Sequence, residues 1–330
     1  MRILVWHVHG SWMTAFVRGD HEYLVPVLPD RGPDGLGRAR TYAWPGDVLE
    51  VAPEELADCD IDVVVLQRPH ELELTRRWTG RSAGRGTGDA RGTRGATLPA
   101  VYVEHNTPRG DVTGWRHPMA TRDDVPLVHV TTFNAAMWDN GTAPVRVIEH
   151  GIPDPGYRYT GEEETLAVCC NEPVRRHRVA GIDLVAILAR TVPVAVYGMG
   201  LTGLDRLVPT GLVAATELVQ HELHDRMSRH RAYLHPYRWT SLGLGLIEAM
   251  HLGLPVLALA STAAPDAVPA GAGLVDSDVD HLAEAAAKLV ADPDLAREWG
   301  MVARRHALRR FGLQRFLDDW DALLEEVAAG

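Results

Sequence analysis

The stretch Thr240–Val256, TSLGLGLIEAMHLGLPV, passes from a glycine-bearing turn into a helical pattern and then into the start of a strand. Gly243 and Gly245 would let a ligand approach the backbone closely. The free N–H groups at the start of such a helix favour phosphate. Glu248 is the one charged residue between Thr240 and Pro255. It either bonds paired hydroxyls, such as those of a ribose, or points to solvent or to an arginine.

Outside this stretch, short apolar runs alternate with helical segments, which is typical of parallel sheets covered by helices. In the first half, strands are predicted at Ile3–Val8, Asp62–Leu66, Ala100–Val103, Leu127–Val130 and Arg146–Ile148. In the second half they are predicted at Thr165–Cys170, Val194–Tyr197, Ala232–Leu234 and Pro255–Leu259, with helices between them. Open sheets of this α/β class bind ligands at the carboxyl ends of their strands.

The segment GIPDPG, Gly151–Gly156, is the strongest break in the pattern and predicts an inter-domain hinge. We therefore expect one domain over residues 1–153 and a second over 154–312. The amphipathic helix that follows, within 313–330, could cross back onto the first domain. Residues 79–97 are rich in glycine and arginine, and we expect a mobile surface loop there.

Composition excludes several classes of protein. Of the 330 residues, 46% are hydrophobic and 23% charged, and the net charge is -11, so no nucleic-acid partner is expected. No apolar run reaches the ~20 residues of a membrane span, so no stable membrane insertion is expected. Three cysteines form no disulfide pattern, and the N-terminus begins in a strand pattern, which favours a cytoplasmic protein.

Three further motifs are weak. Gly198-Met-Gly-Leu-Thr-Gly203 follows a strand but meets Pro209 too soon to open the long helix of a dinucleotide site. The D-x-D strings at 58–62 precede a strand, and those at 276–280 are typical of helix caps. His7 and His9 lack further metal ligands. We therefore expect no metal, and an NAD-dependent oxidoreductase is a minor alternative.

The run Glu248–Val256, EAMHLGLPV, resembles the E-A-M-A-x-G-x-P-V signature of glycosyltransferase family 4, which comprises retaining enzymes of the GT-B fold. Gly243 matches a glycine of that family's E-G-F-G turn. Three more segments resemble the family in chain order: Tyr102–His105, Arg146–Pro153 and Ala264–Val275. The resemblance implies two facing Rossmann-like domains with parallel sheets and a cleft between them. The first domain would be the acceptor side, and the second would bind the nucleotide sugar.

By this resemblance, Glu248 would hold the nucleotide ribose. Thr240 stands where the family has a glutamate that touches the donor sugar, so the sugar cannot be inferred. The resemblance adds a set of donor-binding residues: Ser241, Leu242, Gly243, Leu244, Arg175, Gly10 and Ser11.

The family also places an arginine and a lysine against the diphosphate. This chain has one lysine, Lys288, far from the matching segment, so arginine must serve both roles. We expect Arg176 and Arg178 there, although a solvated basic turn would explain the same residues. His105 would contact the donor sugar or the reacting centre. Without the resemblance, a packed loop histidine is its simpler interpretation.

The sequence thus predicts a glycosyltransferase that moves a sugar from a nucleoside diphosphate to an acceptor hydroxyl or amine, with retention of the anomeric configuration. The nucleotide sugar is a co-substrate, and no metal and no further cofactor is expected. The acceptor would be a small molecule or a glycan. Two alternatives on the same scaffold stay open: a sugar-nucleotide epimerase and a non-catalytic nucleotide-sugar-binding protein.

Overall fold

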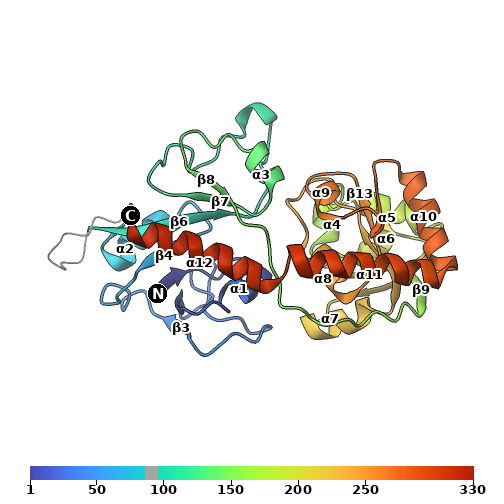
Figure 1. The fold of residues 1–330 in the computed structure, drawn as a ribbon, viewed down its shortest axis with the longest axis horizontal. Coiled ribbons are helices and arrows are strands. Elements are labelled where there is room, and N and C mark those ends of the chain that lie inside the picture. Colours follow the sequence, from blue (N-terminus) through green and yellow to red (C-terminus); the bar gives the residue numbers. More distant parts are fainter. Residues whose placement is uncertain (86–95) are drawn as a thin grey trace. The chain divides into compact units, whose positions relative to one another are not determined.

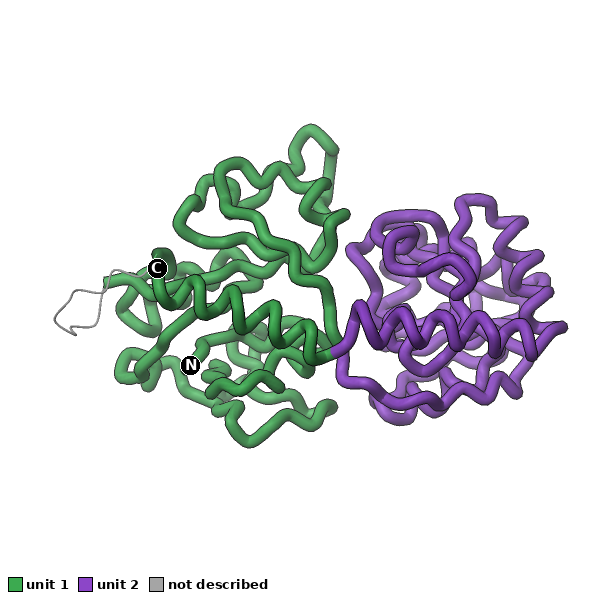
Figure 2. The backbone as a smooth tube through the Cα atoms, in the orientation of Figure 1, with its two compact units in different colours: residues 1–151, 313–330 green, residues 152–312 purple. Residues whose placement is uncertain are grey.

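The computed structural model describes residues 1–85 and 96–330 and divides the chain into two compact units (Figure 2). Unit 1 comprises Met1–Gly151 and Leu313–Gly330, and unit 2 comprises Ile152–Gly312. Each unit holds one parallel sheet with helices packed on it (Figure 1). The predicted α/β class is therefore confirmed.

The sheet of unit 1 has the strand order β3-β2-β1-β4-β6-β7-β8, with β5 paired to β6. Its strands are β1 (Arg2–Val5), β2 (Glu22–Pro26), β3 (Val48–Val51), β4 (Val63–Leu66), β5 (Ser82–Gly84), β6 (Thr97–Glu104), β7 (Leu127–His129) and β8 (Val145–Val147). Its helices are α1 (Gly10–Phe16), α2 (Glu71–Thr79), α3 (Thr132–Met137) and α12 (Leu313–Ala329), with a 3-10 turn, η1, at Val112–Gly114.

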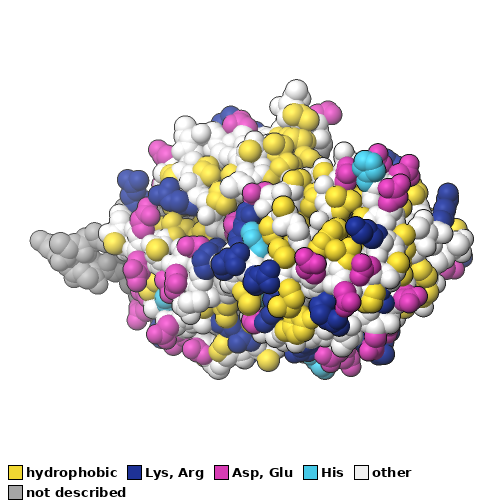
Figure 3. All heavy atoms as spheres, turned by 45° about the vertical axis from the view of Figure 1, so that its right-hand side comes forward, with side chains coloured by type: hydrophobic (Ala, Val, Ile, Leu, Met, Phe, Trp, Pro, Cys, Tyr) yellow, Lys and Arg dark blue, Asp and Glu magenta, His cyan; other side chains and the backbone are white. Residues whose placement is uncertain are grey.

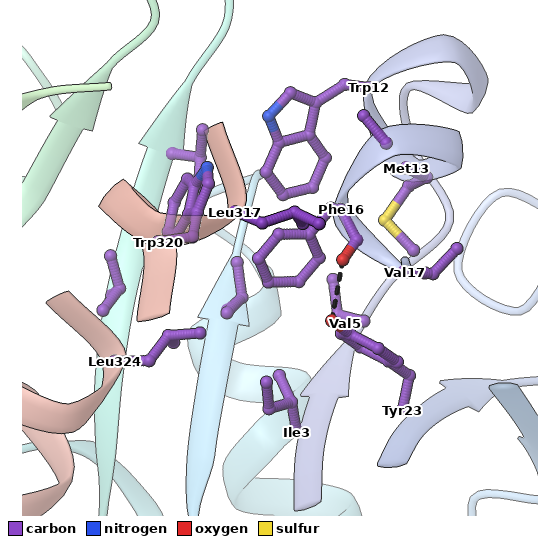
Figure 4. Packing of buried hydrophobic residues seen from close by; sticks show 14 of the residues in the cluster. Ile3, Val5, Trp12, Met13, Phe16, Val17, Tyr23, Leu317, Trp320 and Leu324 are labelled. Atoms are coloured by element: carbon purple, nitrogen blue, oxygen red, sulfur yellow. Dashed lines mark hydrogen bonds between the residues drawn. The ribbon is translucent and has the colours of Figure 1, made fainter. Parts of the chain in front are cut away.

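Helix α12, which comes last in the chain, completes the core of unit 1. Its apolar stripe places Trp320 against Trp12 and Phe16 of α1, over strand residues such as Ile3 (Figure 4). The ring of Phe316, on the same stripe, has its centroid 6.3 Å from that of Trp12. The ring centroids of Trp12 and Trp320 are 5.6 Å apart and the rings meet at 76°, an edge-on arrangement favoured by aromatic quadrupoles. Aromatic side chains therefore pack α1, which follows the first β-strand, against a helix about 300 residues later in the chain.

The region expected to be a mobile loop, 79–97, contains ordered structure at both ends. Ser82–Gly84 forms β5, which runs parallel to the first residues of β6, with Ala83 opposite Leu98. Thr79 is the last residue of α2. The centre of the expected loop, residues 86–95, lies outside the described residues.

The sheet of unit 2 has the order β11-β10-β9-β12-β13-β14 and is parallel throughout. Its strands are β9 (Glu163–Cys169), β10 (Val194–Tyr197), β11 (Leu212–Thr216), β12 (His230–His235), β13 (Val256–Leu259) and β14 (Gly273–Asp276). Its helices are α4 (Pro173–Arg176), α5 (Ile182–Leu188), α6 (Leu204–Leu207), α7 (Gln220–Met227), α8 (Leu244–Leu252), α9 (Ala264–Ala267), α10 (Val279–Ala291) and α11 (Pro293–Arg310).

Helices cover the two faces of this sheet in separate groups. Helix α10 packs against α5, whereas α11 packs against α8, and α8 also contacts α7. Helix α8 is buried from Leu246 to Leu252, as its nearly uninterrupted apolar sequence predicts.

The surface carries both signs of charge. On the face drawn in Figure 3, basic and acidic side chains are intermixed with apolar ones. None of the helices in the described ranges, 1–85 and 96–330, is long and apolar enough to cross a membrane.

Candidate functional site

The sheet of unit 2 changes direction between β9 and β12. After β9 the chain proceeds through β10 to the β11 edge, whereas after β12 it proceeds through β13 to the β14 edge. The loops that follow β9 and β12 therefore diverge to opposite faces and leave a crevice at the carboxyl ends of these two strands. Cys170 and Asn171 follow β9, and Pro236 to Leu242 follow β12, so the predicted stretch begins at this point.

Two contacts tie these loops together. Gly181, at the start of α5, has a φ of +70°, and a Cβ there would clash with the carbonyl oxygen of Pro236. Arg238 forms a bidentate pair with Asp183, with N–O distances of 2.6 and 2.8 Å, and also donates to the carbonyl of Arg178. Arg238 was not among the predicted residues, because the carboxylate that it meets lies 55 positions away.

The three predicted arginines differ in their surroundings. Arg175 is exposed and pairs with Glu172, with Nε 2.9 Å from Oε1. Arg178 is 70% exposed along its side chain and lies 3.0 Å from Asp183. Arg176 is half-buried, and its guanidinium carbon lies 5.2 Å from the centre of the Tyr237 ring. Among the described residues, Arg176 has no carboxylate partner, so its charge is the one left for a ligand.

The turn Thr240–Leu244 connects β12 to α8. Ser241 and Leu242 are buried, and Thr240, Gly243 and Leu244 are half-buried. A Cβ on Gly243 would lie 2.8 Å from Cε1 of His235, and one on Gly245 would lie 2.9 Å from Cβ of Cys169. These glycines therefore allow α8 to start directly on the strand ends. Protein atoms fill the space on the Cβ side of both glycines, and contact of their backbone with a ligand stays a prediction.

His235, below Gly243, is buried, and neither ring nitrogen has a hydrogen-bond partner among the described residues. Burial lowers its pKa to about 4, so the imidazole is neutral at pH 7. Its ring lies between those of Tyr233 and Tyr237, with centroids 6.4 and 4.9 Å away. The base of the turn is thus an uncharged aromatic layer.

Glu248 lies one turn into α8 and is only 6% exposed. Its Oε1 accepts a hydrogen bond from Nε2 of Gln220, at 2.9 Å. Nε2 of His224 is 3.7 Å from the same oxygen. Glu248 therefore neither points into solvent nor pairs with an arginine. It is a buried carboxylate near the carboxyl ends of the strands.

Unit 1 has an equivalent change of direction between β1 and β4. Gln67, just after β4, donates from Nε2 to the carbonyl of Trp6 and presents its Oε1 to Nε2 of His105 at 3.0 Å. Because Oε1 can only accept, the proton of the neutral His105 ring resides on Nε2. The predicted residue His105 is thereby held in one tautomer at the end of β6.

Three imidazoles gather here with a tryptophan. The ring of His105 lies 4.1 Å from that of His9, 5.1 Å from that of Trp12 and 6.4 Å from that of His150. Burial holds the pKa of His105 well below its ordinary value and lowers that of His150 to about 3. Burial also lowers the pKa of His9. The cluster is therefore neutral at pH 7.

A buried hydrogen-bond network fixes the turn that carries His105. Oε1 of Glu104 accepts from the backbone N–H of Asn106, at 2.6 Å, and Oε2 lies 3.0 Å from Nε2 of His117. Nδ1 of His117 accepts from the N–H of Met119, so Nε2 donates to Glu104. Both Glu104 and His117 are buried.

Gly10 and Ser11 start α1, directly after His9. Oγ of Ser11 is 3.0 Å from Oη of Tyr42, and a Cβ on Gly10 would lie 3.0 Å from the Tyr42 ring. Tyr42 therefore lies over both predicted residues, a contact that spacing in the sequence could not indicate.

The weak motifs have ordinary structural roles. Gly203 leads into α6, which has only four residues, so the G-x-G-x-x-G string opens no long helix. Asp278 caps α10 by accepting from the N–H of Asp280, as predicted. Residues 1–85 and 96–330 contain no group of three or more His, Cys, Asp or Glu side chains that could hold a metal ion.

Comparison with known proteins adds family information for unit 2. Residues 181–292 match the family described as Glycosyl transferases group 1. A segment of 79 residues is 35% identical to a trehalose synthase from Rubrobacter xylanophilus, covering 23% of this chain and 19% of that protein. The chain thus spans about a fifth of the length of this curated relative.

Solved structures resemble nearly the whole chain. Sucrose-phosphate synthase from Thermosynechococcus elongatus has a TM-score of 0.72 at 13% identity, covering 100% of this chain and 99% of that one. Anabaena HepE, solved with UDP and glucose, has a TM-score of 0.72 at 14% identity over 98% and 99% of the two chains. AviGT4, a glycosyltransferase of avilamycin A biosynthesis, has a TM-score of 0.61 at 16% identity over 100% and 98%. The fold is GT-B, and within it residues 181–292 match the glycosyl transferases group 1 family.

Proposed function

We propose that the protein transfers a sugar from a UDP-sugar to an acceptor hydroxyl or amine, with retention of the anomeric configuration. The proposal rests mainly on which residues the family match includes. The family match, 181–292, contains both the turn Thr240–Leu244 and the buried Glu248 at the strand ends of unit 2. UDP is the nucleotide of choice because HepE, which shares the fold, was solved with UDP and glucose.

In this proposal, unit 2 binds the donor. Glu248 accepts hydrogen bonds from the ribose hydroxyls, and the N–H groups at the start of α8 face the diphosphate together with the turn Thr240–Leu244. Arg176 is the arginine that contacts the diphosphate, because Arg175 and Arg178 already have carboxylate partners. A guanidinium next to a departing diphosphate stabilises the charge that develops on it.

Unit 1 supplies the acceptor side. His105, held neutral with its proton on Nε2, contacts the sugar or the reacting centre, and Gly10 and Ser11 line the same side. A phosphate oxygen of the donor assists the removal of the acceptor proton, so neither a side-chain nucleophile nor a metal is required. Positioning then accounts for most of the rate enhancement.

Binding of nucleoside diphosphates tests the proposal directly. We expect UDP to raise the melting temperature more than GDP, ADP or dTDP do, because ligands that bind only the folded state stabilise it. Incubation with UDP-sugars and candidate acceptors should then yield UDP and a glycoside whose anomeric linkage is that of the donor. Conversion of the sugar without an acceptor would indicate an epimerase, and binding without turnover would indicate a non-catalytic protein.

Glu248→Ala tests the ribose assignment. A hydrogen bond to a charged group contributes about 1.5–3 kcal/mol, so UDP should bind roughly 10- to 100-fold more weakly to this variant. Isothermal titration calorimetry measures the change, and circular dichroism checks the fold. Unchanged UDP affinity in a folded variant would remove Glu248 from the site.

A further inference from the structure

Helix α7 presents two polar side chains to Glu248. Gln220 and His224 are four residues apart, so they share one face of the helix, and α7 packs against α8. Gln220 is half-buried and donates to Oε1 of Glu248 at 2.9 Å. His224 is 7% exposed, and its Nε2 lies 3.7 Å from the same oxygen. Two nitrogen atoms therefore compete for one carboxylate oxygen.

Only one of these nitrogens is bonded. Nε2 of His224 is buried and has no hydrogen-bond partner among the described residues. A buried polar atom of this kind costs stability and calls for an explanation. The amide of Gln220 makes no hydrogen bond to His224: its NH₂ group donates to Glu248, and its carbonyl oxygen, which could accept, is not bonded to Nε2.

We propose that His224 recognises a ribose hydroxyl and that Gln220 occupies the position of this hydroxyl when no nucleotide is bound. The inference rests on the proposed function, since it takes the ribose of a nucleoside diphosphate as the ligand of Glu248. A hydroxyl can donate to Oε1 of Glu248 and accept from Nε2–H of His224 at the same time. In the structure the amide makes only the bond to Glu248.

The ligand therefore exchanges one hydrogen bond for two. Gln220, being half-buried, turns its amide toward solvent when the ribose enters, whereas His224 stays in place and gains its missing partner. The site thus distinguishes ribonucleotides from deoxyribonucleotides, because a deoxyribose would leave the Nε2 atom of His224 unpaired. His224 is a specificity-determining residue in this scheme.

Calorimetry with UDP, 2′-deoxy-UDP and 3′-deoxy-UDP tests the inference. The wild-type protein should bind UDP about three- to tenfold more tightly than at least one deoxy analogue, the factor expected for a neutral hydrogen bond. His224→Phe keeps a ring but no nitrogen, so it should bind UDP more weakly and lose that preference. His224→Gln, whose amide nitrogen reaches a similar distance, should restore part of it.

Gln220→Ala is the matched variant, and it should change UDP affinity in the opposite direction. Removal of the amide leaves Glu248 open, so UDP should bind about two- to fivefold more tightly. An undiminished preference for UDP in folded His224→Phe, or equal binding of the three nucleotides by the wild-type protein, would overturn the inference. If the wild-type protein binds no UDP, the proposed function itself fails, which is a distinguishable result.

Discussion

The two units place different chemistry at equivalent points of their sheets. In unit 2, the ends of β9 and β12 carry a half-buried arginine, Arg176, and a buried carboxylate, Glu248. In unit 1, the ends of β1, β4 and β6 carry His9 and His105, imidazoles whose pKa values burial lowers. Unit 1 thus places neutral imidazoles at its strand ends, with Glu104 and Arg68 among the charged groups near His9, whereas unit 2 places a cation and a carboxylate there.

Under the proposed function, this difference would assign a different part of the reaction to each unit. A diphosphate needs cations and N–H groups, which unit 2 offers. A sugar or an acceptor hydroxyl needs neutral donors and acceptors, and a neutral imidazole provides one of each. In that proposal the same doubly wound architecture would serve both halves of a transfer, because the residues at the strand ends and not the sheets determine the chemistry.

The largest effect should come from unit 1. His105→Phe keeps the ring contacts with His9 and Trp12 but removes both ring nitrogens and the hydrogen bond to Gln67 that orients the ring. We expect turnover to fall about 100-fold, the loss typical of a misplaced reacting group. UDP affinity, which unit 2 provides, should stay within about threefold. Turnover of UDP-sugar and calorimetry with UDP separate the two quantities. A folded variant with wild-type turnover would exclude His105 from the reaction.

Gln67→Glu tests the role of His105 through the pH dependence of turnover. A carboxylate placed 3.0 Å from Nε2 would raise the pKa of His105, which is now held low by burial. A raised pKa means that the ring is protonated at the lower end of the pH range, so turnover should acquire an acid limb and fall as pH decreases toward 5. Gln67→Ala controls for the lost contact with Trp6, and the pH profile of its turnover should show no new acid limb.

A smaller effect separates the arginines of unit 2. Arg176→Gln should weaken UDP binding about 10- to 100-fold, because Arg176 is the one of the three predicted arginines that has no carboxylate partner among the described residues. Arg178→Gln should change UDP affinity by less than about threefold, since Arg178 is exposed and pairs with Asp183. Calorimetry at constant ionic strength compares them. Equal losses in both variants would mean that the whole basic turn contacts the nucleotide.

The sequence predicted the buried elements better than the edges. Val194–Tyr197 has the predicted bounds, because its apolar run ends at clear breaks. The edge strands β3 and β11 were missed, since both are short and half-exposed and so lack a strong apolar pattern. β2 was missed as well, although its residues Tyr23 to Val25 are fully buried and carry the usual signal of a central strand.

The sequence predicted where the candidate site residues lie but not which residues they contact. Spacing placed Glu248 and His105 at strand and helix ends. It could not show that Gln220 reaches Glu248 or that Gln67 sets the tautomer of His105, because these contacts join segments 28 and 38 residues apart. Arg178 illustrates the same limit, since its proximity to Asp183 depends on how α5 begins.

The smallest expected effect concerns the rigidity of the charged crevice. Gly243→Ala places a methyl group 2.8 Å from Cε1 of His235, a buried ring that cannot move freely, so the free energy of unfolding should fall by about 1–3 kcal/mol. Gly46→Ala in unit 1 is the control, since a Cβ there meets nothing within 4 Å. The double variant Gly243→Ala/His235→Ala should recover part of the loss. If Gly243→Ala and Gly46→Ala melt alike, α8 can shift away from β12, and the turn that faces the diphosphate is less rigid than its contacts with His235 indicate.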